Sequence, residues 1–318
     1  MRRMRFVRSF TYSTREFWRV AVYNPLMDLI EYEQQALDAI HEWKSPDLGW
    51  LDKIMETVNR PINKMGDTAM SAPVIGWALD KSISGLVSLL SDAAHWSVRR
   101  KAIFKEYRKK GLGVESLEDI GRLRLHDVDR TIGFLAAKYK SLALVEAAGT
   151  GVLGVAGIPA DVIGVISLNM RAIGEYATYC GFDVGSQAER LFAMNILGLS
   201  SSPSDAQKKV AMSQIVKIAK DVAQRRSWTT LEQGAFMAII ERVANSLGLR
   251  LTKAKLAQIV PIVGVGVSAG FNLYYTTKVC DAAYFLYRER FLAEKYGQDM
   301  IEATVLEAED YEPDYEDE

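Results

Sequence analysis

The sequence predicts an all-α protein, a multi-helix bundle with two glycine-rich apolar helical hairpins at its centre. Three observations predict this class. Apolar residues recur at helical spacing along most of the 318 residues. No stretch of strand length alternates apolar and polar residues, and β-branched residues do not cluster between turn signals. Two long stretches, 145–183 and 256–277, are rich in glycine and poor in charge.

Start and stop signals divide the chain into helices. Prolines, glycines and capping residues mark the boundaries, and Ser116 with Asp119 and Ser186 with Glu189 each fit a capping box. In chain order, the predicted helices occupy the residues to about 43, 51–65, 74–110, 116–145, 161–180, a stretch from 186, 202–226, 229–248 and a long helix through 278–297.

The glycines of the two apolar stretches are interpreted as a packing face. Each glycine inside a helix costs roughly 1 kcal/mol relative to alanine, and close contact between helix backbones can offset this cost. The face consists of Gly149, Gly151, Gly154, Gly157, Gly264, Gly266 and Gly270. It is compatible with a buried soluble core and with a re-entrant or interfacial contact with a membrane.

The two halves of the chain share an order of features. Each half passes from a charged amphipathic helix to a glycine-rich segment, and then to an aromatic helix that ends in "YCGFD" (179–183) or "YGQD" (296–299). The alignment requires a gap, so an internal duplication is one interpretation and coincidence is the other.

Charge divides the chain into three parts, although the net charge is only −1. Residues 1–29 form a basic N-terminal segment, 30–300 form the helical domain, and 301–318 form an acidic tail that we expect to be disordered. The two cysteines have no pattern of paired spacing, which favours a reducing compartment. No apolar segment follows the basic start, so we expect a cytoplasmic protein.

Several charged residues lie in or beside the first apolar stretch. An isolated buried charge is costly, so each must be paired, capping a helix or functional. The candidate residues are Glu146, Asp161, Arg171, Asp183, Glu189 and Arg190. One alternative is a metal-assisted hydrolase that uses Asp161, Asp183 and Glu189, which would require these carboxylates to converge on one point.

Other recognisable chemistry is weak. "GTGVLG" at 149–154 fits a dinucleotide-binding fingerprint, but the residues before it are helical in pattern rather than strand-like. The three histidines and two cysteines lack the spacing of a zinc site. We therefore expect no cofactor, no metal and no nucleic-acid partner, and the oligomeric state is left open.

The stretch from Glu146 to Arg190 resembles the bacterial EcsC family. The shared pattern is a Glu followed by Thr-Gly, spaced glycines, a Pro-x-Asp or Asp-x-Pro turn, a helix with Arg-x-Ile, then Tyr-x-Gly-Phe-Asp and a Glu-Arg pair. These positions are Glu146, Thr150, Gly151, Gly154, Gly157, Asp161, Arg171, Ile173, Gly181, Asp183, Glu189 and Arg190. The resemblance covers about residues 30–295 and includes "EWKSPDLGW" and "IVPIVGVGVSAGFN".

The resemblance implies an accessory protein, because the family takes its name from a gene beside an ABC-type exporter. It implies no catalytic mechanism. Our first hypothesis is a non-enzymatic helical protein that associates with the inner face of a membrane, or with a membrane protein, through its glycine-rich hairpins. The hydrolase is one alternative, and a soluble scaffold whose acidic tail docks a basic partner is another.

Overall fold

The computed structural model describes residues 25–44, 73–202, 211–219, 233–259 and 268–297. Within these ranges every regular element is a helix, which confirms the predicted all-α bundle. In chain order the elements are α1 (Pro25–Lys44), α3 (Pro73–Ser91), the 3₁₀ helix η1 (Ala93–Trp96), α4 (Arg100–Lys109), α5 (Leu117–Gly121), α6 (Leu125–Ile132), α7 (Leu135–Thr150), the 3₁₀ helix η2 (Gly151–Gly157), α8 (Ile158–Tyr179), α9 (Gln187–Ser200), a helical stretch at 211–219, α11 (Gln233–Ile259) and α12 (Ser268–Tyr296).

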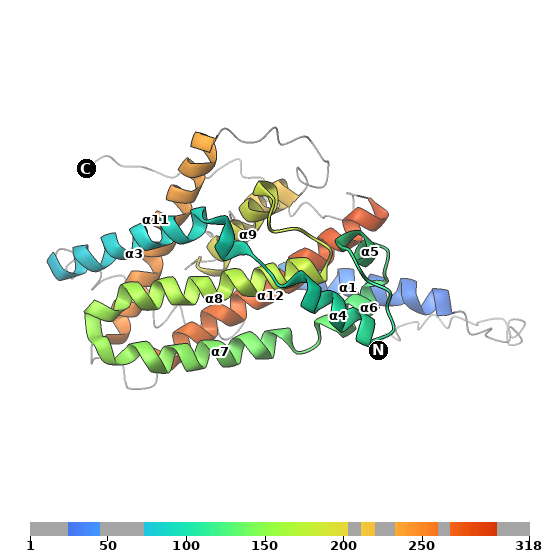
Figure 1. Ribbon diagram of the computed structural model, residues 1–318, viewed down its shortest axis with the longest axis horizontal. Helices are drawn as coiled ribbons and strands as arrows, with labels where there is room; N and C mark the ends of the chain where they lie inside the picture. The colour runs from blue at the N-terminus through green and yellow to red at the C-terminus, as the bar shows by residue number, and fades with distance from the viewer. Residues whose placement is uncertain (1–24, 45–72, 203–210, 220–232, 260–267, 298–318) are drawn as a thin grey trace, which may run out of the picture.

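Helix α8 lies at the centre of the bundle. It is packed between α3 on one side and α7 on the other, and α12 runs behind it (Figure 1). Helices α7 and α8 form an antiparallel hairpin through η2, whereas α11 crosses α3 at a steep angle (Figure 1). Most residues of α8 are buried, which explains why this helix is largely apolar.

The polar residues of α8 are accommodated by local hydrogen bonds. Asn169 donates to the Val165 carbonyl at 2.7 Å, and the Thr178 hydroxyl donates to the Gly174 carbonyl at 2.8 Å. A buried polar group without a partner would cost about 1–3 kcal/mol, so these bonds allow an apolar helix to contain polar side chains.

The C-terminus of α8 is a Schellman motif. Phe182 N–H donates to the Ala177 carbonyl at 2.8 Å and Gly181 N–H donates to the Thr178 carbonyl at 3.1 Å. Gly181 has φ +86°, a left-handed conformation that glycine adopts without steric cost. The predicted end of this helix near residue 180 is therefore confirmed, and "GFD" turns the chain toward α9.

Two long predicted helices are divided in the structure. The stretch 74–110 becomes α3, η1 and α4, because the Asp92 side chain accepts from Ala94 N–H at 2.8 Å and starts a separate turn. The stretch 116–145 becomes α5, α6 and α7, and Gly133 with φ +50° ends α6.

The second half of the chain also departs from prediction. Helix α11 does not end at Gly248 but continues to Ile259. Gly248 packs closely on α3 instead, since a Cβ there would lie 2.6 Å from Ile83 Cγ1. The predicted helix at 51–65 and the predicted capping residues at 229–232 lie outside the described residues.

Close packing of glycine occurs at positions other than the predicted face. A Cβ at Gly85, Gly164, Gly174 or Gly248 would lie within 3 Å of a side chain from another element. Gly154 and Gly270 are exposed, and a Cβ at either would meet nothing within 4 Å among the described residues. Neither glycine packs against another described element, and the packing face as a whole stays a prediction. At Gly154 the reason for glycine is its φ of +56°, which kinks η2.

The rest of the predicted glycine face is only partly described. Gly157 is buried at the start of α8, and Gly149 and Gly151 lie at the α7–η2 junction. Gly264 and Gly266 lie outside the described residues, as do residues 1–24 of the predicted basic segment 1–29 and the whole acidic tail. The second glycine-rich hairpin and the internal duplication remain predictions.

Candidate functional site

Three consecutive charged residues are buried in α12. Successive residues of a helix point about 100° apart, so Arg288, Glu289 and Arg290 face three different neighbours. Arg288 Nη2 is 2.8 Å from Asp129 Oδ2 on α6, Glu289 accepts from Lys44 on α1, and Arg290 pairs with Glu189 on α9. All three residues are at most 5% exposed, so α12 is surrounded by protein on these three sides.

The Arg290–Glu189 pair is enclosed by aromatic rings. Arg290 forms a bidentate pair, with Nη1 donating to Glu189 Oε2 at 2.8 Å and Nη2 donating to Oε1. Its guanidinium lies 4.2 Å from the Phe182 ring centre and 4.5 Å from that of Phe192. The planar guanidinium therefore fills an aromatic slot and neutralises a buried carboxylate, which is a structural role.

The Asp129 carboxylate joins a second buried network. Besides Arg288, it accepts from the Tyr32 hydroxyl at 2.7 Å. Burial raises the pKa of Asp129, and the Arg288 charge opposes that shift. Arg288 also lies 4.4 Å from the centre of the Tyr284 ring. The network connects α1, α6 and α12 at one end of the bundle.

A third polar cluster connects α7, α8, α11 and α12 near the η2 turn. Lys255 Nζ lies 2.5 Å from Asp161 Oδ2 and also donates to Asn272 Oδ1. Asn272 Nδ2 donates to Asp161 Oδ1 at 3.2 Å, which closes a triangle between three helices. Glu146 reaches the same place from α7, and bare backbone at Gly164 makes room for it. A Cβ on Gly164 would lie 2.0 Å from Glu146 Oε1.

The electrostatics of this cluster favour protonation of Glu146. Burial, and then repulsion from Asp161, raise the pKa of Glu146 to about 7, and the Lys255 charge opposes both. Burial lowers the pKa of Lys255, whereas its contact with Asp161 raises it. Two carboxylates share one ammonium group, so this cluster can hold an additional proton near neutral pH.

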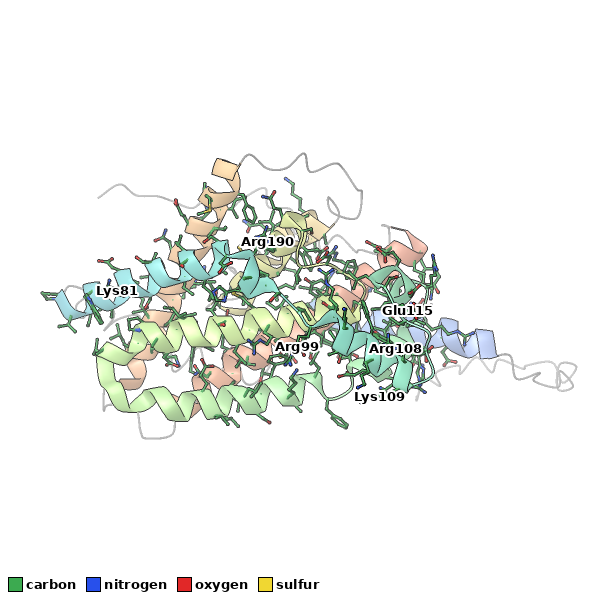
Figure 2. All side chains as sticks on the ribbon, viewed as in Figure 1. Lys81, Arg99, Arg108, Lys109, Glu115 and Arg190 are labelled. Carbon is green, nitrogen blue, oxygen red and sulfur yellow. The ribbon has the colours of Figure 1, made fainter. Side chains whose placement is uncertain are left out.

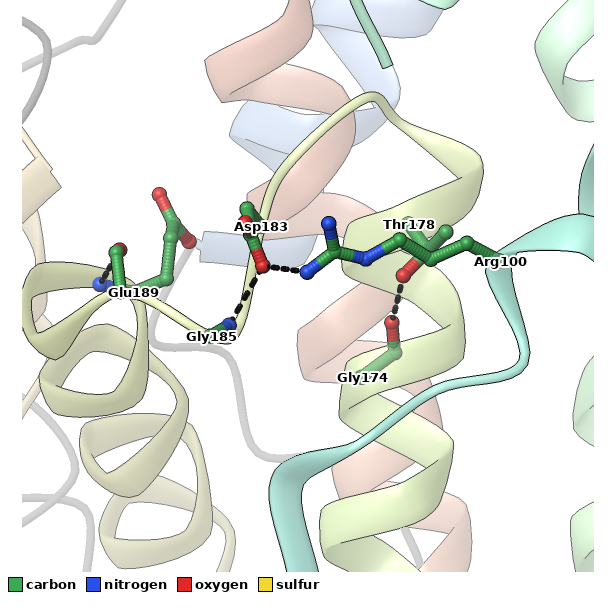
Figure 3. A network of polar contacts seen from close by, with 7 residues as sticks. Arg100, Gly174, Thr178, Asp183, Gly185 and Glu189 are labelled. Carbon is green, nitrogen blue, oxygen red and sulfur yellow. Dashed lines mark hydrogen bonds and ion pairs between the residues drawn. The ribbon is translucent and has the colours of Figure 1, made fainter. Parts of the chain in front are cut away.

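The six predicted polar residues do not form one site. Glu146 and Asp161 lie together, but Asp183 lies beyond the far end of α8, where it pairs with Arg100 and accepts from Gly185 N–H at 2.7 Å (Figure 3). The part of α8 from Asp161 to Tyr179 is already about 27 Å long, at a rise of 1.5 Å per residue, and Asp183 lies beyond it. Of the two remaining arginines, Arg171 is exposed and Arg190 lies 5.2 Å from the Phe236 ring centre.

This arrangement does not meet the requirement of the metal-assisted hydrolase, which was that three carboxylates converge on one point. Asp161, Asp183 and Glu189 each face a different cation and share no point. Among the residues that the structure describes, no group of three or more His, Cys, Asp or Glu side chains could hold a metal ion. The carboxylates at these positions serve the packing of the bundle.

The second predicted capping box is also only half formed. The Ser186 hydroxyl accepts from Glu189 N–H at 3.1 Å, but the Glu189 carboxylate accepts from Arg290 instead of capping the helix. The first box, Ser116 with Asp119, has both reciprocal bonds. Burial decides the difference, because α9 presents Glu189 to the core whereas Asp119 is at the surface.

Sequence reasoning missed the partners on α11 and α12. The residues that it did not identify are Lys255, Asn272, Glu289 and Arg290. The available signal was "RER" after "AAYFLY". Three successive charges cannot all lie on the solvent face of a helix that is apolar before them.

Among the helices of the described residues, two are long and apolar enough to cross a membrane by length and composition alone. They are Pro73–Ser91, whose apolar window is 28% buried, and Gly154–Tyr179, whose window is 61% buried. The second is the core helix α8. The first, α3, exposes two large apolar side chains, Val74 and Trp77, near its start.

Together the fold and its buried ion pairs define an all-helical protein whose charged core residues connect helices. The chain belongs to the EcsC protein family, which it matches over residues 34–292. It is 25% identical over 222 residues to an uncharacterised protein of Bacillus subtilis (strain 168), YdbA, with 68% of this chain and 78% of YdbA covered. It is 23% identical over 181 residues to protein EcsC of the same organism, with 57% of this chain and 71% of EcsC covered. No solved structure matches the chain.

Proposed function

We propose that this protein is a non-enzymatic helical accessory protein that associates peripherally with the cytoplasmic face of a membrane. The single observation that carries the proposal is the outer face of α7. This helix lies at the edge of the bundle and packs against α8, α12 and η2 (Figure 1). Its outward side chains include Leu142, Leu144 and Val145, which are 42%, 43% and 72% exposed.

Helix α7 carries apolar residues on its outer side, next to the exposed Lys138 and Ser141, as well as on its inner side. Its inner side buries Leu135, Tyr139 and Ala143 in the core. A helix at the edge of a water-soluble bundle normally carries polar residues on its other side. The exposed Leu142, Leu144 and Val145 at the second half of α7 are therefore better explained by contact with lipid than by contact with water.

The start of α3 adds to the same end of the molecule. Val74 and Trp77 are 59% and 46% exposed, and α3 contacts η2, which follows α7 directly. Tryptophan is enriched where a protein meets the headgroup layer, because its ring is apolar and its N–H is polar. Because α8 is buried in the core of the bundle, we expect α7 and the start of α3 to lie along the membrane surface rather than α8 to span the membrane.

The proposal is tested by vesicle flotation of the purified chain. The double variant Leu144→Glu/Val145→Glu should float at least about tenfold less than the wild type, because two lost apolar contacts of roughly 1 kcal/mol each exceed the 1.4 kcal/mol that corresponds to a factor of ten. Leu249→Glu is the matched control, since Leu249 is 39% exposed on α11. A wild-type chain that stays in solution with every vesicle preparation would refute the proposal.

A further inference from the structure

Helix α4 separates a buried apolar face from an exposed basic face. It buries Ile103, Phe104 and Tyr107 against the core. Lys101, Lys105 and Lys109 are exposed and spaced four apart, so they form one stripe along the helix. Figure 2 shows Lys109 near Arg108 and Arg99 on this part of the molecule, while Lys81 lies apart on α3.

The stripe continues onto α6. Lys110 donates to the Arg130 carbonyl, and Arg130 Nη2 lies 3.5 Å from the Lys110 carbonyl oxygen. These contacts hold the C-terminal ends of α4 and α6 together, with both side chains exposed. We call this set the basic ridge, and its members are Lys101, Lys105, Lys109, Lys110 and Arg130.

Phe134 projects beside the basic ridge. It is 90% exposed, the highest value among the large hydrophobic side chains of the described residues. Gly133, with φ +50°, ends α6. Phe134 follows it directly and lies four residues after Arg130 in the sequence. Burying a phenylalanine side chain contributes up to about 3 kcal/mol, so moving Phe134 from water into an apolar environment would be favourable.

Phe134 also lies in line with the apolar outer face of α7. Lys138 N–H donates to the Phe134 carbonyl at 3.0 Å, so Phe134 directly precedes α7 and its carbonyl accepts the first hydrogen bond of the helix. Eleven residues separate Phe134 from Val145, which at 100° per residue places them about 20° apart around the helix axis. One line along α7 therefore has an exposed apolar side chain at each end.

We infer that the basic ridge and Phe134 form a binding surface for a bilayer that contains anionic lipids. The lysines contact headgroup phosphates while Phe134 enters the edge of the hydrocarbon layer. This inference rests on the proposed function, and it adds the lipid class and the orientation, with α7 lying flat on the bilayer. Each basic residue near an anionic surface contributes about 1 kcal/mol, and an acidic protein partner would not explain an exposed phenylalanine in line with Val145.

The test compares phosphatidylcholine vesicles with vesicles that also contain phosphatidylserine. The full chain should prefer the anionic vesicles, and high salt should remove the preference because it screens the headgroup charge. Lys101→Glu/Lys105→Glu/Lys109→Glu should lose on the order of a hundredfold in anionic binding, at about fivefold or more per lysine. The matched control, Lys81→Glu/Lys217→Glu/Arg242→Glu, changes the net charge equally at exposed positions on other helices and should retain the preference.

Phe134→Ala separates the aromatic contribution from the charge. It should weaken binding to both vesicle types while leaving the preference for phosphatidylserine in place. All variants are exposed at the surface, and an unchanged far-ultraviolet circular dichroism spectrum and thermal midpoint would confirm that they fold.

Three results would overturn the inference. Equal binding of the ridge variant and the charge-matched control would remove the role of the ridge but leave the proposed function standing. A second result is that the ridge variant binds vesicles as the wild type does and yet fails to bind a peptide of residues 307–318 that the wild type binds. The ridge would then be a binding site for the acidic end of the chain and not for lipid. Absence of binding to any vesicle would refute both the inference and the proposed function.

Discussion

The Arg290→Met variant tests whether buried ion pairs hold the bundle together. The substitution leaves the Glu189 carboxylate, which is 6% exposed, without its bidentate partner. Removing one partner of a buried pair typically costs about 3–5 kcal/mol. The whole stability of a domain is about 5–15 kcal/mol, so this loss would be a large fraction of the total.

Methionine is chosen so that packing changes little. Its flexible side chain fills the slot between Phe182 and Phe192 and makes favourable sulfur–aromatic contacts. The expected cost therefore comes mainly from the stranded carboxylate. The double variant Glu189→Leu/Arg290→Met should recover most of the loss, because replacing both charges with apolar groups removes the desolvation cost. The Ser186 cap survives in both variants, since it uses the Glu189 backbone N–H.

The assay is urea unfolding followed by circular dichroism, with midpoint and slope fitted for each variant. Arg100→Met is the matched control, because the Arg100–Asp183 pair is 42% and 44% exposed and should contribute at most about 1 kcal/mol. The reasoning would be refuted if Arg290→Met lowered the free energy of unfolding no more than Arg100→Met does. So would a double variant whose loss equals the sum of its two single losses.

Two further predictions concern proton binding and backbone geometry. The pKa of Glu146 is raised from 4.5 to about 7, so the folded state binds this proton more tightly than the unfolded state, and stability should fall as pH rises from about 4.5 to 7. Glu146→Gln should flatten that part of a plot of thermal midpoint against pH, and an unchanged slope would contradict the assignment. Gly181→Ala should destabilise the fold by about 1–2 kcal/mol, because a Cβ at φ +86° is strained and would lie 3.1 Å from the Leu117 carbonyl oxygen. Gly121→Ala is the control in urea unfolding, since nothing lies within 4 Å of a Cβ there, and equal losses at both positions would contradict the argument.

Local signals in the sequence were sufficient for the class of fold and for several helix ends. The capping box at Ser116 and the end of α8 near Gly181 depend on residues within six positions of one another, so the sequence displays them directly. The missed breaks in the long helices have local causes too. Asp92 and Gly133 caused them, but either residue can also occur within a continuous helix, and tertiary packing decides which outcome is realised.

The candidate site was less predictable because its contacts are distant in sequence. Asp161 and Lys255 are far apart in the chain, and nothing local to either residue names the other. Glu189 shows the difficulty most clearly. Its position three residues after Ser186 predicted a capping role, yet the buried Arg290 attracts its carboxylate more strongly than a backbone N–H does.

Helix α7 shows why periodicity alone could not orient the proposed membrane surface. An amphipathic pattern indicates which side of a helix faces water, but α7 has apolar residues on both sides. Only the packing of Tyr139 and Ala143 against the core identifies Leu144 and Val145 as outward. Once that orientation is known, the apolar residues on the outer side of α7 indicate a surface that contacts something other than water. A helix side that packs against no other described element and carries apolar residues at both ends, beside a row of lysines, has the chemistry of a bilayer surface.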